Sequence, residues 1–457
     1  MASAAEQLAA NLSYSTFSKA TDLKKRLWFT LLALIVYRIG TYIPIPGINP
    51  EALARAFDTQ GQGVLGLLNV FAGGAVERFA IFALGIMPYI SASIIMQLMT
   101  SVVPTLEALK KEGEQGRKVI NQYTRYGTVI LGTAQAFGIA SGLQASEGMV
   151  LNPGWFWMLS TVITLVGGTM FLMWLGEQIT ARGVGNGISL IIFAGIVAAL
   201  PGAIAQLLDQ GAQGAISTLT MLGVLVSILA LIALIVFVER AQRRLLIQYP
   251  KRQTANSMAQ GDSSHLPLKL NTAGVIPPIF ASSLLLLPAT ITGFSGTGDP
   301  DGIMATINAL LGRGQPGYLI FYGSMIVFFA FFYTAIVFNP TETADNLKQH
   351  GGFIPGIRPG EKTAQYIDYV LTRVSVLGAL YLVFVCLLPE MFLSNLGISA
   401  FLGGTSMLII VSVTLDMVSQ VQSHLFAQQY EGLIKKSSLR GGKGPRGGNS
   451  PRALKRK

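Results

Sequence analysis

The sequence has few charged residues. Only 12% of its 457 residues are Asp, Glu, Lys or Arg, whereas 51% are hydrophobic, and soluble domains carry about 25% charged residues. This scarcity excludes an ordinary soluble domain. Apolar runs long enough to cross a bilayer, which takes about 20 residues, occur ten times, at 27–43, 78–100, 121–141, 155–176, 187–207, 216–238, 272–292, 318–338, 370–389 and 402–424. We therefore expect a polytopic helical membrane protein.

Residue types that serve most enzymes are also scarce. Cys386 is the single cysteine, so the chain has no disulfide framework, and its thiol lies among Val and Leu as a packing residue would. The three histidines, at 265, 350 and 424, lack metal-ligand spacing, and no GxxxxGK[ST] motif is present to bind ATP phosphates. We expect no catalytic residue, no metal and no cofactor.

Basic residues occupy alternate loops. If the N-terminus is placed in the cytoplasm, 29 of the 33 Lys and Arg residues fall on that side. Arg55, Arg78 and Arg313 fall on the other side, and Arg38 lies within the first apolar run. The positive-inside rule then places both termini in the cytoplasm, which requires an even number of spans. The net charge of +11 thus reflects membrane orientation rather than nucleic-acid binding.

Three charged residues lie in or near the predicted spans. Arg38 is near the outer end of the first span, Glu177 closes the fourth, and Asp416 is deep in the tenth. Charges within a membrane mark ion or solute paths, so a proton-coupled transporter is one interpretation. Helix-packing partners are the interpretation that we favour, and the specific roles of Arg38 and Asp416 stay open.

Two apolar stretches broken by proline resemble one another. GIMPYISASIIM (85–96) and GVIPPIFASSLL (274–285) share Gly, Pro, Ile, Ala and Ser at five aligned positions. If the ten spans divide into two halves of five near 201–213, each stretch lies in the second span of its half. An odd number of spans per half means that the second half enters from the opposite side, as in inverted repeats. The predicted fold is all-α, with ten transmembrane helices in two inverted five-helix halves.

A shorter apolar segment precedes the second span. Residues 64–72 are bracketed by Gly63 and by Gly73 and Gly74, and they are too few to cross a bilayer. An interfacial amphipathic helix fits this pattern. A re-entrant helix fits equally well, provided that it is buried in protein or lines a cavity.

Seven strings along the chain resemble the SecY family, the channel-forming subunits of the bacterial protein translocase. They are YRIGTYIPIPGI, IFALGIMPYISASIIMQL, KKEGEQGRKVINQYTRYGT, FLMWLGEQITARGVGNGISLIIFAGIV, HLPLKLNTAGVIPPIFASS, FFYTAIVFNPTETADNL and FIPGIRPGEKTAQYID, and the resemblance runs from about Leu23 to Leu433. It implies a clamshell of two halves with an hourglass pore between them. It also implies a channel of the Sec pathway that moves unfolded preproteins across the bacterial cytoplasmic (inner) membrane and inserts membrane proteins laterally.

The resemblance also assigns roles to particular residues. By default an isoleucine in a membrane helix faces lipid, although Ile86 and Ile90 share one helix face, as do Ile188 and Ile192. The family's constriction ring falls on Ile86, Ile90, Ile188, Ile192, Ile279 and Ile409. Its plug helix falls on residues 63–76, with Gly63, Val64, Leu65, Leu67, Leu68, Phe71, Gly73 and Gly74 as the candidates. Its lateral gate, between spans two and three and spans seven and eight, includes Pro88, Ser91, Gln97, Pro277, Ser282 and Ser283.

Partners follow from the same resemblance. Arg243, Arg244 and Arg358 match basic docking residues for the SecA ATPase and the ribosome, although a surface arginine is by default a solvated charge. SecE and SecG would complete the channel, signal-sequence-bearing polypeptides and membrane lipid would be its other contacts, and no direct DNA binding is implied.

The chain is accordingly expected to consist of two halves with a cytoplasmic tail at each end. We expect an N-terminal tail at 1–22, a first half at 23–207 and a second half at 208–433 with cytoplasmic loops at 239–271 and 339–369, followed by a basic disordered tail at 434–457. A secondary solute transporter is the alternative, because such proteins also use inverted five-helix repeats. It would require polar groups converging at mid-membrane, where this sequence has isoleucines.

Overall fold

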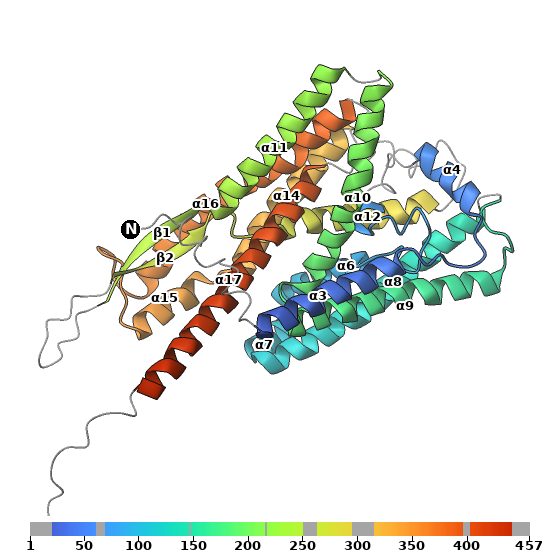
Figure 1. Ribbon diagram of the computed structural model, residues 1–457. Coiled ribbons are helices and arrows are strands. Elements are labelled where there is room, and N and C mark those ends of the chain that lie inside the picture. Colours follow the sequence, from blue (N-terminus) through green and yellow to red (C-terminus); the bar gives the residue numbers. More distant parts are fainter. Residues whose placement is uncertain are drawn as a thin grey trace, which may run out of the picture.

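Helices dominate the structure, which is a computed structural model (Figure 1). It describes residues 21–60, 69–145, 148–214, 217–249, 263–294, 315–395 and 403–440. Within these residues, one long helix corresponds to each of the ten apolar runs: α3 (Thr21–Gly40), α6 (Met87–Val102), α8 (Glu114–Ala145), α9 (Trp155–Arg182), α10 (Gly187–Ala212), α11 (Thr218–Arg240), α12 (Ile276–Phe294), α14 (Pro316–Val337), α16 (Glu361–Asn395) and α17 (Gly404–Arg440). The shorter helices α4 (Pro50–Gln60), α7 (Pro104–Lys111) and α15 (Pro340–Gln349) lie between them.

The first five and the last five long helices share four neighbour pairs in the same order, although α3 also packs against α9 in the first half. In the first half, α6 packs against α8, α8 against α9, α9 against α10, and α10 against α3. In the second half, α12 packs against α14, α14 against α16, α16 against α17, and α17 against α11. In both halves, therefore, the second to fifth helices are successive neighbours and the fifth returns to the first. This shared order is what a structural repeat produces.

The two halves meet along two seams. Along the first, α12 packs against both α6 and α8. Along the second, α10 packs against α11 and α17, and α17 also contacts α3. Because α10 and α11 are consecutive in the chain, the backbone crosses between the halves at the second seam. The helices of the first seam are remote in sequence, so side-chain packing alone joins them.

The two repeated stretches begin their helices in the same way. Gly85 has φ of 56° two residues before α6, and Gly274 has φ of 64° two residues before α12. Only glycine adopts this left-handed conformation without steric cost. In each helix a proline then occupies the first turn, where its missing N–H costs no hydrogen bond. The repeat seen in the sequence is thus a repeat of backbone conformation at two helix starts.

The second predicted span starts later than expected. The sequence predicted a span at 78–100, but residues 72–86 form successive turns and α6 begins at Met87. The Ile45 N–H donates to the Phe79 carbonyl at 3.0 Å, and the Ile81 N–H donates to the Ile43 carbonyl at 3.0 Å. These bonds between two segments of the chain replace helical hydrogen bonds that residues 78–86 would otherwise make.

The two large loops predicted to be cytoplasmic fold into one unit. Strands β1 (Gln242–Gln248) and β2 (Ser263–Lys269) pair antiparallel, with Leu245 opposite Leu266. Gln248 also exchanges two backbone hydrogen bonds with Phe353 of the second loop, at 2.9 and 3.0 Å. The apolar core of this unit consists of Leu245, Leu268, Ile354, Ile367, Val370 and Val374. Figure 1 shows β1, β2 and α15 together at one end of the molecule, remote from α4.

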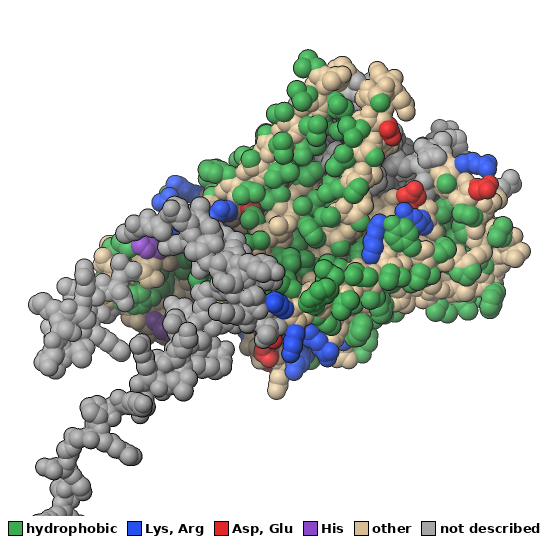
Figure 2. All heavy atoms as spheres, viewed as in Figure 1, with side chains coloured by type: hydrophobic (Ala, Val, Ile, Leu, Met, Phe, Trp, Pro, Cys, Tyr) green, Lys and Arg blue, Asp and Glu red, His purple; other side chains and the backbone are tan. Residues whose placement is uncertain are grey.

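The outer surface of the helices is apolar, as a membrane protein requires. By length and composition, six helices within the described residues are able to cross a membrane (α9, α10, α11, α14, α16 and α17), and the bent pair α6 and α7 makes up to seven. Large apolar side chains face outward along them, such as Phe237 on α11, which is 74% exposed. Figure 2 shows these side chains as a broad green surface over the middle of the molecule.

Candidate pore, gate and docking surface

The six isoleucines of the expected ring belong to the large apolar core that both halves share. Ile86, Ile90, Ile192, Ile279 and Ile409 are between 0% and 7% exposed, and Ile188 is half-buried and packs against the same cluster. They come from α6 and the residue before it, and from α10, α12 and α17. Both halves therefore contribute side chains to the cluster, and five of the six are buried inside the protein rather than facing lipid.

A small cavity lies beside these isoleucines. It measures about 10 Å³, which is room for about one water molecule. Its wall consists of Tyr37, Phe71, Gly85, Ile86, Met87, Ile90, Leu172, Ile191 and Ile192. Sequence reasoning missed Tyr37, Met87, Leu172 and Ile191, because an aromatic or aliphatic residue in an apolar helix carries no signal that separates a cavity wall from ordinary packing.

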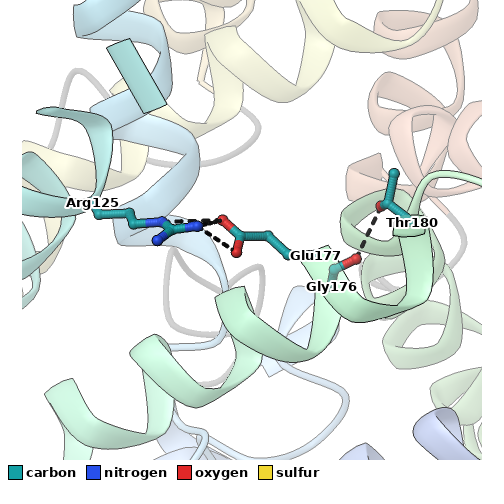
Figure 3. Close-up of polar contacts among 4 residues, drawn as sticks. All are labelled: Arg125, Gly176, Glu177 and Thr180. Carbon is teal, nitrogen blue, oxygen red and sulfur yellow. Dashed lines mark hydrogen bonds and ion pairs between the residues drawn. The ribbon is translucent and has the colours of Figure 1, made fainter. Parts of the chain in front are cut away.

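The start of α10 is fixed by polar contacts with α9. The Asn186 side chain accepts a hydrogen bond from the Ile188 N–H at 3.2 Å, which caps the helix. The Gly187 N–H donates to the Thr180 hydroxyl at 2.9 Å. That hydroxyl in turn donates to the Gly176 carbonyl (Figure 3). Gly176 and Gly187 approach so closely that a side chain on Gly187 would collide with the Gly176 carbonyl. This close contact sets the position of Ile188 and Ile192.

An ion pair joins α8 to α9 close to the Thr180 contact. Figure 3 shows Arg125 and Glu177 pointing toward each other. The guanidinium of Arg125 donates to both carboxylate oxygens of Glu177, with distances of 2.7 to 3.2 Å. A two-pronged contact of this kind fixes relative orientation as well as distance. Glu177 is thus a packing partner, as we interpreted it from the sequence.

The expected plug lies partly outside the described residues. Gly63, Val64, Leu65, Leu67 and Leu68 are not among them, whereas Phe71, Gly73 and Gly74 are. Phe71 is buried beside the ring isoleucines.

The described end of this segment is held by two side chains. The Arg38 guanidinium donates to the Gly73 carbonyl at 2.6 Å. The Asn69 side chain accepts from the Glu77 N–H at 3.0 Å and donates to the Glu77 carboxylate at 3.3 Å. Arg38, whose role the sequence left open, therefore ties α3 to the segment that was expected to form the plug.

The expected gate residues lie on α6 and α12, two of the helices that form the first seam. Pro88, Ser91, Pro277, Ser282 and Ser283 are buried on these helices. The Ser283 hydroxyl is 3.8 Å from the Met87 sulfur, which joins the two helices directly.

The polar side chains of this seam bond mainly within their own helix. Ser282 and Ser283 both donate to the Ile279 carbonyl. The Gln97 side chain donates to the Ser93 hydroxyl at 3.3 Å, and its oxygen has no partner among the described residues. Among the side chains that the structure describes, few polar bonds therefore cross the seam.

A polar network that the sequence did not reveal holds the start of α12. The buried Asn271 side chain donates to the Glu239 carboxylate at 2.7 Å and to the Gly274 carbonyl at 3.1 Å. Glu239 lies at the end of α11. The sequence carries no sign of this role for Asn271, because its partner Glu239 lies on a different helix.

The three expected docking arginines lie on the folded loop unit. Arg243 and Arg244 are exposed on β1, and Arg358 is exposed in the loop before α16. The Arg358 carbonyl accepts a hydrogen bond from the Thr363 hydroxyl at 2.9 Å, which fixes this loop to the helix. Among the described residues, no group of His, Cys, Asp and Glu is arranged to hold a metal ion. Asp416 is exposed on α17.

Comparisons of the whole chain agree with this architecture. Residues 80–418 match the SecY family. The chain is 54% identical over 423 residues to the protein translocase subunit SecY of Escherichia coli strain K12, covering 92% of this chain and 96% of that protein. It is 52% identical over 432 residues to the subunit of the same description from Vibrio cholerae, covering 93% and 97%.

Solved structures show the same fold. One described as a protein conducting channel superposes with a TM-score of 0.64 at 19% identity, covering 88% of this chain and 92% of the other. A second solved structure, described by the stabilisation of the closed translocation channel by the plug domain of SecY, superposes with a TM-score of 0.65 at 19% identity and with the same coverage. The chain therefore belongs to the SecY family of protein translocase channel subunits.

Proposed function

We propose that this chain conducts unfolded preproteins through a pore that its own isoleucines close. The observation that carries the proposal is that six isoleucines, from four helices and both halves, lie in the large apolar core that the halves share, where Ile86, Ile90 and Ile192 line one small cavity. Branched alkyl groups exclude water and bind no ion. They also deform around an extended polypeptide of any sequence. Residues 63–76 add a second seal, supported by the burial of Phe71 against the cluster.

The first seam is the lateral gate in this proposal. Helix α12 packs against α6 and α8 with few polar bonds between their described side chains, so separation of this part of the seam leaves few unpaired polar groups. An opening there would give membrane-protein segments direct access to lipid. The second seam keeps its backbone connection and acts as the hinge side.

Energy for transport comes from partners that dock on the loop unit. The chain acts as a channel and not as an enzyme, so SecA or a translating ribosome would push the polypeptide, with SecE and SecG completing the complex. Arg243, Arg244 and Arg358 are exposed on one folded unit, which presents them in a fixed arrangement. The chain resides in the bacterial cytoplasmic membrane, with both termini in the cytoplasm.

Reconstitution tests the proposal. The chain is incorporated into liposomes with SecE and SecG, and uptake of a protein bearing a signal sequence is measured by protease protection. We expect uptake that requires SecA and ATP. Uptake of a small solute, with none of the protein substrate, would instead identify the transporter alternative.

A further inference from the structure

Two of the four basic residues that the positive-inside pattern does not explain meet on one aromatic ring. The guanidinium carbon of Arg38 is 4.9 Å from the centre of the Tyr42 ring, and that of Arg78 is 4.2 Å from it. Arg38 lies in the last turn of α3 and Arg78 among the turns that precede α6. Backbone pairing between residues 43–45 and 79–81 brings the two segments together.

The two guanidinium groups differ in how many hydrogen bonds they make within the protein. Arg38 is half-buried and donates to the Gly73 carbonyl at 2.6 Å and to the Tyr42 hydroxyl at 3.0 Å. Arg78 is exposed and, within the described residues, makes neither a hydrogen bond nor an ion pair. Its donors therefore face solvent or membrane.

The pair keeps a net positive charge. No ion pair within 4.0 Å involves Arg38 or Arg78 in the described parts of the chain. The Glu77 carboxylate, next to Arg78 in the sequence, accepts a hydrogen bond from the neutral Asn69 amide and offsets at most one of the two positive charges. Two guanidinium groups held near one ring repel each other, and an anion between or beside them would relieve that repulsion while accepting charge-assisted hydrogen bonds.

An apolar stripe leads to this pair along α3. Trp28, Ile35, Ile39 and Tyr42 follow one another at helical spacing and are 63%, 45%, 58% and 52% exposed. Tyrosine and arginine at the end of such a stripe are typical of the level at which lipid headgroups lie. Figure 2 shows basic side chains within the green surface on this face of the molecule. The surroundings therefore match a ligand with an anionic head and an apolar chain.

We propose that Arg38, Arg78 and Tyr42 bind the phosphate of an anionic phospholipid, whose acyl chain lies along the exposed face of α3. The assignment to the leaflet opposite the loop unit rests on the proposed function and its orientation, whereas the binding itself does not. Arg78 supplies the free donors, Arg38 supplies fixed charge, and the Tyr42 ring holds both guanidinium groups in place through cation–π contacts.

The test is a lipid titration of the full chain in neutral detergent micelles, read by native mass spectrometry. Phosphatidylglycerol is added to the parent, to Arg78→Gln and to Arg55→Gln. Arg55 is the matched control, because it lies on α4 at the same end of the molecule and pairs with Glu51. We expect Arg78→Gln to lose one bound phosphatidylglycerol per chain, with affinity at that site falling roughly tenfold, as for the loss of a charge-assisted contact. Arg55→Gln should behave as the parent, and Arg78→Lys should lie between the two.

Several results would overturn the proposal. One is unchanged stoichiometry and affinity in Arg78→Gln, and another is equal binding of phosphatidylcholine at the same site. Displacement of the bound lipid by millimolar inorganic phosphate would identify a soluble anion as the natural occupant and not a lipid. Because the titration involves neither transport nor membrane orientation, its failure is distinct from a failure of the proposed channel function.

Discussion

Gly85 and Gly274 each place a left-handed residue two positions before a helix of the first seam. An L-amino acid in that conformation loses roughly 1–2 kcal/mol relative to glycine. Since Ile86 directly follows Gly85 and the two helices carry Ile90 and Ile279, the direction in which these isoleucines project depends on two residues without side chains. The surroundings of Gly274 make it the cleaner test, because a methyl group there would meet nothing within 4 Å.

Gly274→Ala should therefore destabilise the protein by about 1–2 kcal/mol through backbone strain alone. The control is Gly138→Ala on α8, where the added methyl group also meets nothing within 4 Å and φ is not positive. That control should be neutral or stabilising by up to about 1 kcal/mol, because alanine favours helix. Unfolding in mild detergent measures both variants. Equal stability of the two would contradict the role assigned to Gly274.

Ile279→Asn should make the resting channel leak ions. An amide in the apolar cluster favours water there and weakens a seal that works by excluding it. Conductance of the closed channel in planar bilayers should rise, whereas Ile279→Leu, which keeps the side-chain volume, should stay close to the parent. If the asparagine variant is as tight as the parent, Ile279 contributes only to packing.

At the scale of helices and strands, the seam formed by α12 with α6 and α8 differs from the contacts within each half. Within the first half, α8 and α9 are tied by the Arg125–Glu177 ion pair, and α9 and α10 by Thr180 and Gly187. The seam, by contrast, has the weak contact between Ser283 and Met87. The halves should therefore separate at this seam before either comes apart internally.

Cross-linking tests this difference. Met87→Cys with Ser283→Cys places a thiol on each side of the seam, and the single native cysteine, Cys386, is buried away from reagents. Joining the pair with a short bifunctional thiol reagent should abolish transport. The control pair, Ala92→Cys with Gly127→Cys, joins α6 to α8 within one half, where the two Cβ positions lie 3.4 Å apart. Transport that survives the first cross-link would show that this seam does not open.

Arg358→Glu should strongly slow SecA-driven transport while leaving membrane insertion and resting conductance intact. A guanidinium makes two parallel hydrogen bonds to a carboxylate or phosphate of a partner. A glutamate at this position would repel the same anionic group, and an ammonium cannot reproduce the two-bond geometry. Arg358→Lys should be intermediate, and initial rates in proteoliposomes measure all three. Parental rates for Arg358→Glu, with a slow Arg244→Glu, would place docking on β1 instead.

At the scale of the whole molecule, the two ends differ in structure. One end carries the folded loop unit with its basic side chains, and the other carries α4 and the turns near Val150. The loop unit has its own apolar core, so it projects as a compact body rather than as separate loops. Such a body suits the side on which partners supply energy.

Reporter fusions should reveal this orientation directly. An enzyme active only outside the cytoplasm should be active when fused at Gly148 and inactive when fused at Arg358. These sites lie in loops at opposite ends of the molecule, before α9 and before α16. Activity at Arg358 would reverse the membrane orientation and the leaflet of the proposed lipid site.

The sequence predicted the long helices because each rests on a local apolar run, and it predicted the repeat because Gly85 and Gly274 are each followed by proline. It placed the start of the second span too early, since the bonds from residues 79 and 81 to residues 43 and 45 depend on tertiary contact. Helix α17 extends to Arg440, whereas the composition of the sequence predicted that a disordered tail begins at residue 434. Asn271 was missed for a similar reason, because its partner Glu239 lies on another helix. Tyr37 was missed because an aromatic residue in an apolar helix carries no signal of a cavity wall.

The pairing of Gln248 with Phe353 also constrains the order in which the chain assembles. A chain is synthesised from its N-terminus, so β1 and β2 emerge before α12 and α14, and Phe353 emerges only after both. Until then the hairpin lacks its third partner, and most of the residues that fill its core, Ile354 and Ile367 among them, do not yet exist. The unit that we propose to receive partners is thus completed late in biosynthesis, after α12 and α14 have been synthesised. A nascent chain arrested before Phe353 would hold both sides of the first seam without a finished docking unit.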